Sequence, residues 1–271
     1  MKSKRLMRFV SLMAALLIVF SLAACSKAGD AEEAGDLLAR VKARGTLVIA
    51  TEGDWAPWTY HDENGVLTGF DVEIGKLIAE GLGVEAEFKE TDWDSILAGV
   101  EAGRFDIACN GVGYTEERAK SYYFSDPYLY SPQVLVVRAD NEDIKTLDDL
   151  KGKTTANTAS STYAEVAESY GATVTPVNTL QDTIELLLAG RVDATLNSKL
   201  SILDYLDQHP DAEIKIVSED EGEIMVFPVA RTDDAKPLID EVNKILKTLR
   251  ENGKLGELST KYFGADLTNA D

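Results

Sequence analysis

Short apolar runs alternate with helical patterns along most of the chain. Residues 46–50 form an apolar run bounded by turn residues, which is typical of a buried strand. After a turn at Asn64-Gly65, apolar side chains recur at spacings of three and four from Ile74, and Asp71 is placed to cap that helix. Because strand, helix and strand follow in this order, the pattern predicts an α/β fold with parallel sheets and crossover helices.

One short segment has a counterpart later in the chain. Residues 102–110 and 189–197 share Ala, Gly, Arg, Asp and Asn at identical offsets, and each follows an amphipathic helix pattern and leads into a strand. Convergence on a common helix–Gly–strand solution would explain this, and so would two similar α/β lobes. We favour two lobes. Since ligands of open α/β sheets bind beyond the carboxyl ends of strands, both Asn ends would point towards one shared cleft.

Two long connections predict where the chain crosses between the lobes. Residues 126–132 precede a strand at 134–137, and the acidic residues 218–223 precede a strand at 224–229. A helical pattern begins at Pro237 and packs against the first lobe. The predicted domains are lobe 1 at 45–131 and 226–266, lobe 2 at 132–225 and a tail at 267–271.

The N-terminus has the three parts of a secretory signal peptide at residues 1–24: a basic start, an apolar run and small residues. The apolar run from Phe9 to Phe20 is shorter than the ~20 residues that a membrane-spanning helix needs. Leu22-Ala23-Ala24-Cys25 is similar to the lipobox of bacterial lipoproteins, which implies lipidation of Cys25 and a membrane anchor. An ordinary signal peptide with a free Cys25 is the alternative. Residues 25–44 would form a linker and a short helix.

Composition and charge narrow the function classes. The chain has 271 residues, 45% of them hydrophobic, as in folded globular proteins. Its formal net charge of −20 argues against nucleic acid as a partner, because phosphate binding needs a basic face. Once Cys25 is lipidated, Cys109 has no cysteine left to pair with, so we expect no intramolecular disulfide.

Five further motifs follow one another along the chain. They are Thr51–Trp58, Gly69–Asp71, Thr91–Leu97, Thr115–Arg118 and Phe124–Tyr128. Together they resemble the motifs of the family 3 solute-binding proteins, over about residues 45–266. The resemblance implies a type II periplasmic-binding-protein-like fold, with two α/β lobes joined by two hinge crossings. It also implies an extracytoplasmic receptor, expected to be monomeric, that closes on a polar amino acid and delivers it to an ABC permease. Residues 193–197, 203–205 and 262–266 most resemble the cystine-binding branch.

The motifs contain candidate ligand-binding residues. Arg118 follows a capping Thr115, where a guanidinium can grip a carboxylate bidentately, and the resemblance gives it that role. Ser161 and Thr162 begin a helix pattern whose free N–H groups suit an anion, although plain N-capping explains them as well. The resemblance makes Trp55 and Trp93 the aromatic walls around the ligand side chain. The full set of candidates is Glu52, Trp55, Trp93, Asn110, Gly111, Gly113, Arg118, Ser161, Thr162, Tyr163 and Ser198.

The expected ammonium site departs from the family pattern. Relatives commonly have a Ser, Thr or acid at the position of Gly113 and an Asp at that of Ser198. Leaving a buried charge without its partner costs ~3–5 kcal/mol, so either another acid replaces them or the ligand lacks a free α-ammonium. Glu52, Asp54 and Glu223 are the alternatives by chain position, beside the carbonyl of Gly111. Glu52 could instead meet the far end of the ligand.

Support for catalysis is weaker. The two histidines, His61 and His209, lie in predicted surface loops, and no spacing typical of a metal site or a phosphate-binding loop occurs. We therefore expect no cofactor and no metal. An enzyme on the same fold, resembling the periplasmic cyclohexadienyl dehydratases, remains the alternative from another class. The sensory domain of a receptor is a third possibility, and the chain has no transmembrane segment near Asp271 to support it.

Overall fold

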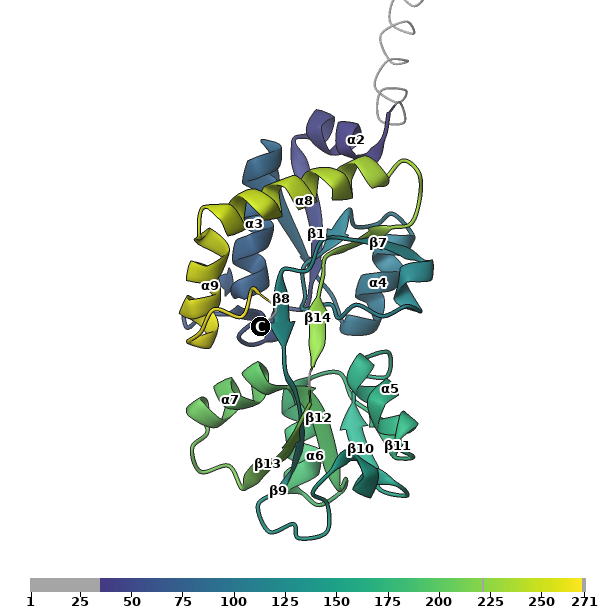
Figure 1. Ribbon diagram of the computed structural model, residues 1–271, viewed down its shortest axis with the longest axis vertical. Coiled ribbons are helices and arrows are strands. Elements are labelled where there is room, and N and C mark those ends of the chain that lie inside the picture. The colour runs from purple at the N-terminus through teal and green to yellow at the C-terminus, as the bar shows by residue number, and fades with distance from the viewer. Residues whose placement is uncertain (1–34, 221, 270–271) are drawn as a thin grey trace, which may run out of the picture.

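The computed structural model describes residues 35–220 and 222–269, which form two α/β lobes stacked along the long axis of the molecule (Figure 1). The predicted signal peptide and Cys25 lie outside the described residues. Among the helices of the described part of the chain, none has both the length and the apolar character that crossing a membrane requires. The two-lobed α/β architecture expected from the sequence is confirmed.

Lobe 1 is built on a parallel sheet of three strands in the order β5-β1-β6, which are β5 (Glu85–Glu90), β1 (Thr46–Thr51) and β6 (Ile107–Ala108). Its helices are α2 (Leu37–Arg44), α3 (Phe70–Leu82), α4 (Trp93–Glu101), α8 (Lys236–Glu251), α9 (Lys254–Phe263) and the 3-10 turn η1 (Arg118–Lys120). Its smaller strands are β2 (Asp54–Trp55), β3 (Thr59–His61), β4 (Leu67–Thr68), β7 (Tyr122–Phe124) and β15 (Pro228–Ala230). The core contains side chains of β1, α3, α8 and α9.

Lobe 2 is built on a sheet of five strands in the order β11-β10-β12-β9-β13. The strands are β9 (Gln133–Arg138), β10 (Thr154–Asn157), β11 (Thr173–Pro176), β12 (Ala194–Ser198) and β13 (Ile214–Glu219). The helices are η2 (Leu147–Leu150), α5 (Thr162–Ser169), α6 (Leu180–Leu188) and α7 (Lys199–Gln208). The predicted parallel arrangement holds for β10, β11 and β12, whereas β9 runs antiparallel to both of its neighbours.

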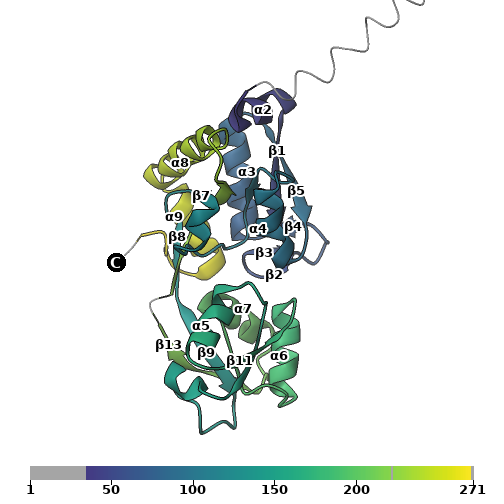
Figure 2. The ribbon, with the colours of Figure 1, turned by 90° about the vertical axis from the view of Figure 1, so that its right-hand side faces the viewer.

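Two antiparallel strands lie side by side between the lobes. They are β8 (Leu129–Ser131) and β14 (Glu223–Met225), and Glu223 pairs with Ser131. Figure 2 shows β8 along one edge of the molecule, on the side away from β2 and β3. The strand predicted at 224–229 is in fact two short strands, β14 and β15, because Val226 leaves the ladder and its N–H donates to the carbonyl of Val112 at 2.9 Å.

The repeated segment has the same structural use in both lobes. Asp106 accepts a hydrogen bond from the backbone N–H of Val48 at 2.7 Å, and Asp193 accepts one from that of Thr154 at 2.8 Å. Each aspartate thereby ties the start of one strand to its neighbour, β6 to β1 and β12 to β10. The glycine after each helix has a positive φ, as a left-handed helix end requires. The repeated segment therefore occupies equivalent positions in two similar lobes.

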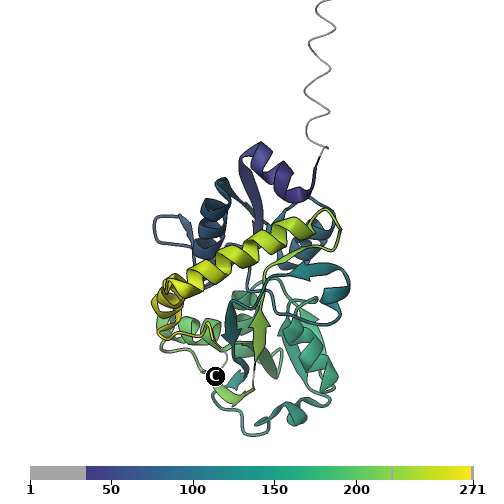
Figure 3. The same cartoon turned by 45° about the horizontal axis from the view of Figure 1, so that its top comes forward.

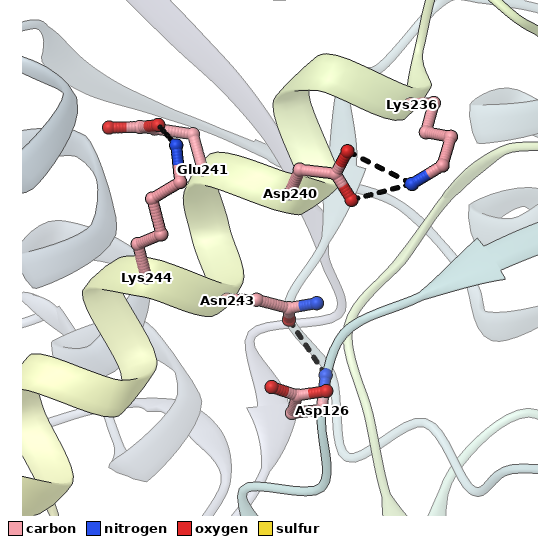
Figure 4. A network of polar contacts seen from close by, with 6 residues as sticks. All are labelled: Asp126, Lys236, Asp240, Glu241, Asn243 and Lys244. Carbon is pink, nitrogen blue, oxygen red and sulfur yellow. Dashed lines mark hydrogen bonds and ion pairs between the residues drawn. The ribbon is translucent and has the colours of Figure 1, made fainter.

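Helix α8 lies across lobe 1 (Figure 3) and returns the end of the chain to it. Its inner face buries Leu238, Ile239, Val242, Leu246 and Leu249. On its outer face, Lys236 pairs with Asp240 at 2.7 Å, with a second ion pair one turn later (Figure 4). Asn243 accepts a hydrogen bond from the backbone N–H of Asp126 at 2.7 Å, so α8 also fixes the segment that leads into β8.

Candidate functional site

A cleft lies between the two lobes, with about 580 Å³ of space free of protein atoms, part of which is open solvent. Its walls come from loops that follow β1, β6, β10 and β11, as expected for a ligand site at the carboxyl ends of strands. Lobe 1 contributes Glu52, Asp54, Trp55, Trp93, Gly111, Gly113 and Arg118. Lobe 2 contributes Asn157, Thr158, Ser161, Thr162, Tyr163, Asn178, Thr179, Leu180, Thr183 and Asn197, and the crossing strand contributes Glu223.

Arg118 reaches from lobe 1 to lobe 2. Its Nη1 donates to the carbonyl of Gly113 at 2.9 Å, and its Nη2 donates to the carbonyl of Ser160 at 3.0 Å. The guanidinium also lies over the ring of Trp93, 5.5 Å from the centroid. Burial lowers the pKa of Arg118 from its usual value. The predicted helix is only the 3-10 turn η1, although Thr115 does accept a hydrogen bond from the Arg118 N–H at 3.0 Å.

The N-terminus of α5 forms the opposite wall. The hydroxyl of Ser161 accepts a hydrogen bond from the N–H of Ala164 at 3.1 Å, so this side chain is an N-cap. The hydroxyl of Thr162 donates to the carboxyl of Glu223. No oxygen among the residues described accepts the backbone N–H of Thr162, which is one of the free groups at a helix start.

The aromatic residues divide between the cleft and the core. Trp55 lines the cleft and stacks on Trp58, with 5.3 Å between ring centroids and 16° between planes. Trp58 is fully buried, and its indole N–H donates to the hydroxyl of Ser201 in α7 at 3.2 Å. Trp93 lines the opposite part of the lobe 1 wall, beneath Arg118.

Two of the predicted site residues lie behind the cleft. Asn110 is fully buried, accepts a hydrogen bond from the N–H of Glu52 at 2.7 Å and donates its own amide to the Glu52 carboxyl at 2.6 Å. Ser198 is also fully buried, and its hydroxyl lies 2.9 Å from that of Ser131. The structure corrects the expectation that these two side chains face a ligand, because each is used to hold a neighbouring segment.

Asp71 has a role that sequence reasoning missed. Helix α3 begins after Gly69, so Asp71 lies in its first turn and does not cap it. Its fully buried carboxyl accepts hydrogen bonds from the N–H of Gly111 at 2.6 Å and the hydroxyl of Tyr128 at 2.9 Å. Burial raises the pKa of Asp71 to about 7. Its position in the Gly69–Asp71 motif was the available signal, and its function is to position Gly111.

Three acids and one guanidinium face the cleft within the described part of the chain. Burial raises the pKa of Glu52 to about 7, and the hydrogen bond from Asn110 offsets part of the rise. Burial also raises the pKa of Asp54. It raises the pKa of Glu223 too, where the hydroxyl groups of Thr162 and Tyr163 partly oppose it. With three carboxyl groups against one guanidinium, the cleft favours a ligand with positive charge, because such a charge stabilises the ionised carboxylates that burial disfavours.

Several polar residues of the lobe 2 wall were not among the predicted candidates. Thr158 follows β10, and Asn178 and Thr179 follow β11. The rule that ligands bind beyond strand ends could have found them, but only with the strand order of lobe 2 in hand. Among the described residues, no group of three or more His, Cys, Asp or Glu side chains is arranged to hold a metal ion.

Comparison with known proteins decides the family. Residues 47–265 match the model of the bacterial extracellular solute-binding proteins, family 3. The chain belongs to this family. It is 42% identical to a probable amino-acid ABC transporter-binding protein of Haemophilus influenzae, over 87% of this chain and 91% of that protein. It is 40% identical to the L-cystine-binding protein TcyA of Bacillus subtilis, over 94% and 97% of the two chains.

Two solved structures that resemble this chain differ in whether a ligand is bound. An ancestral arginine-binding protein bound to arginine is 37% identical, with a TM-score of 0.76, 82% of this chain covered and 99% of that one. The L-cystine solute receptor of Neisseria gonorrhoeae in its unliganded open conformation is 40% identical, with a TM-score of only 0.57, 87% of this chain covered and 100% of that one. The TM-score is thus higher against the ligand-bound relative than against the open one, and in this structure Arg118 of lobe 1 contacts Ser160 of lobe 2.

Proposed function

We propose that this chain is an extracytoplasmic receptor that binds an amino acid between its lobes and delivers it to an ABC importer. One observation carries the proposal. Arg118 of lobe 1 meets lobe 2 beside the N-terminus of α5, where Thr162 lines the same cleft and its backbone N–H has no acceptor among the described residues. A guanidinium and a helix N-terminus are both groups that bind carboxylates, and here they come from different lobes.

Closure follows from this division. A ligand carboxylate bound by Arg118 and by Thr162 satisfies both groups only when the lobes are together, so the ligand stabilises the closed state. Hydrogen bonds to a charged group contribute ~1.5–3 kcal/mol each, enough for a few of them to shift an open-to-closed equilibrium. The hydrogen bond from Arg118 to the carbonyl of Ser160 supports this, because it places the guanidinium within reach of lobe 2.

The cleft suits a polar amino acid with a second cationic group. Glu52, Asp54 and Trp55 line the lobe 1 wall of the cleft, and we place the distal end of the ligand against them. L-cystine has two α-ammonium groups, so it meets the charge condition. Its sulfur-containing middle also packs well on an aromatic face such as that of Trp55. L-arginine meets the charge condition as well. Three of the four relatives named above are described as binding cystine or arginine, which supports the same two ligands.

The proposal includes the parts of the chain and the assembly that the comparisons leave open. Residues 1–24 direct export, Cys25 carries the lipid anchor, and the receptor acts as a monomer at the membrane. The lobes are hinged at the crossings, with boundaries at 45–131 and 226–266 for lobe 1 and 132–225 for lobe 2. The pairing of β8 with β14 supports a hinge of two adjacent strands. The cleft residues named above, Arg118 and Thr162 first, make the binding site.

A thermal-shift panel tests the proposal. The lipid-free domain from residue 35 is heated with each of the twenty amino acids, L-cystine, their N-acetyl forms and α-keto acids. A ligand at ~100 times its Kd adds ~2.7 kcal/mol, which raises the Tm by several degrees. Stabilisation by a free amino acid, without turnover of it, is the expected result. Stabilisation only by carboxylates without an α-ammonium would contradict the proposal and indicate a receptor for another ligand class. Consumption of the stabilising compound would indicate an enzyme.

A further inference from the structure

We infer that Glu223, on the crossing strand β14, is the acid that holds the α-ammonium group of the ligand. The inference rests on the proposed function, since it concerns the same cleft. Neither Gly113 nor Ser198 offers a carboxyl group, and the Ser198 side chain is buried against Ser131 outside the cleft. The acid that the pattern of relatives places on a lobe would here come from the connection between the lobes.

The absence of a side chain at Gly113 is what makes room for Glu223. A Cβ built on Gly113 would lie 3.0 Å from Cδ of Glu223 and closer still to its Oε1. The backbones are held in this register by the antiparallel bridge between Gly113 and Met225, and by the hydrogen bond from the N–H of Tyr114 to the carbonyl of Ile224 at 2.8 Å. The glutamate carboxyl therefore fills the space that a side chain at residue 113 would take.

The contacts of Glu223 leave its charge available to a ligand. The hydroxyl groups of Thr162 and Tyr163 donate hydrogen bonds to it, and the positive charge of Arg118 also favours its ionised form. Yet the guanidinium gives its own hydrogen bonds to the carbonyls of Gly113 and Ser160. Within the described residues, no basic side chain lies within 4.0 Å of this carboxyl. An ammonium group in the cleft would supply the missing partner.

Position favours Glu223 over the other two acids. Arg118 donates a hydrogen bond to the carbonyl of Gly113. The Glu223 carboxyl lies where a side chain of residue 113 would be, and it also contacts Thr162. The carboxylate and the ammonium of an amino acid are attached to one carbon, so their binding groups must lie together, as these do. Glu52 and Asp54 follow β1 at the Trp55 side, and the Glu52 carboxyl is already held by Asn110.

This placement gives the α-ammonium a direct link to the hinge. Glu223 is the first residue of β14 and pairs with Ser131, the last residue of β8. The same carboxyl contacts α5 of lobe 2 and lies over Gly113 of lobe 1. A ligand that pairs with Glu223 thus engages both lobes and the crossing strand at one point.

Isothermal titration of matched ligand pairs tests the inference. L-cystine is compared with 3,3′-dithiodipropionate, which lacks only the two amino groups, and L-arginine with 5-guanidinopentanoate. For the amino acid that the wild type binds, E223Q should raise the Kd at least about 30-fold, as truncating one partner of a buried charge pair does. The Kd of the des-amino compound should change by less than about 3-fold. The control is E219Q, which removes an acid paired at the surface with Lys199 and should leave both Kd values unchanged.

A second variant, G113A, tests the position of the Glu223 carboxyl. G113A adds a methyl group where the Glu223 carboxyl lies, so it should weaken binding of the amino acid selectively, and the double variant G113A/E223Q should bind no worse than E223Q alone. Equal loss for both members of a ligand pair, or full amino-acid affinity in E223Q, would overturn the inference while leaving the receptor intact. If the wild type binds neither amino acid, or prefers the des-amino compounds, the proposed function itself fails.

Discussion

Glu52 should make the ligand-free protein less stable as the pH rises. Its carboxyl is largely buried at the cleft wall, and its pKa is raised from 4.5 to about 7. A carboxyl whose pKa is higher in the folded than in the unfolded state destabilises the folded protein when it ionises. This cost is absent below pH 4.5 and develops as the pH rises through about 7, so stability is lost over that range. Replacing Glu52 by Gln removes this dependence, and the Gln carbonyl can still accept the hydrogen bond from Asn110.

The magnitude follows from the same numbers. A rise from 4.5 to about 7 corresponds to about 3 kcal/mol at pH 8, because one pKa unit is 1.36 kcal/mol. Because solvent in the open part of the cleft screens the charge, we take about 2 kcal/mol as the free-energy cost of ionising Glu52 at pH 8. For a chain of this size, E52Q should then raise the Tm at pH 8 by about 4–8 °C, with most of the gain absent at pH 5.

Calorimetry or circular dichroism of the ligand-free domain at pH 5 and pH 8 measures this difference. E87Q is the matched control, because Glu87 is an exposed acid of β5 whose pKa is lowered by its contact with Lys89, so its replacement should give no gain at pH 8. The reasoning about burial is refuted if E52Q changes the Tm equally at both pH values, or if it lowers the Tm at pH 8.

Three further variants probe the support of the site. D71A leaves the N–H of Gly111 and the hydroxyl of Tyr128 without their partner, at about 1–3 kcal/mol each, so unfolding in urea should show a clearly lower midpoint and ligand affinity should fall with it. S161A removes the N-cap of α5, which costs about 1 kcal/mol and should lower the Tm by a few degrees. W55A removes an aromatic face from the cleft and should weaken L-cystine at least about 10-fold in a titration, with little change for a small amino acid such as glycine.

The sequence was sufficient for the local elements. The apolar run at 46–50 is β1, the periodic pattern after Asp71 is α3, and the hydroxyl residues at 161–162 begin α5. These signals are short in range, because spacing and caps act within one element. The family motifs added Arg118 and the aromatic walls, and the cleft contains both.

What the sequence could not supply depends on contacts between distant segments. Ser198 ends β12 and Asn110 follows β6 by two residues, but only the packing of neighbouring loops shows that their side chains point behind the cleft. The role of Asp71 requires Gly111 and Tyr128 to meet at one point. Glu223 was one of three acids that chain position allowed, and the space above Gly113 distinguishes it from the others.

The central claim is that one amino acid is bound by its carboxylate between Arg118 and the N-terminus of α5. Titration of L-cystine and L-arginine into the wild type and into R118A measures this directly. We predict one binding site in the wild type for at least one of these ligands, and a Kd in R118A that is higher by about 100-fold or more, as the loss of two charged hydrogen bonds implies. Unchanged affinity in R118A would contradict the account, because the ligand would then be held without the group that joins the two lobes.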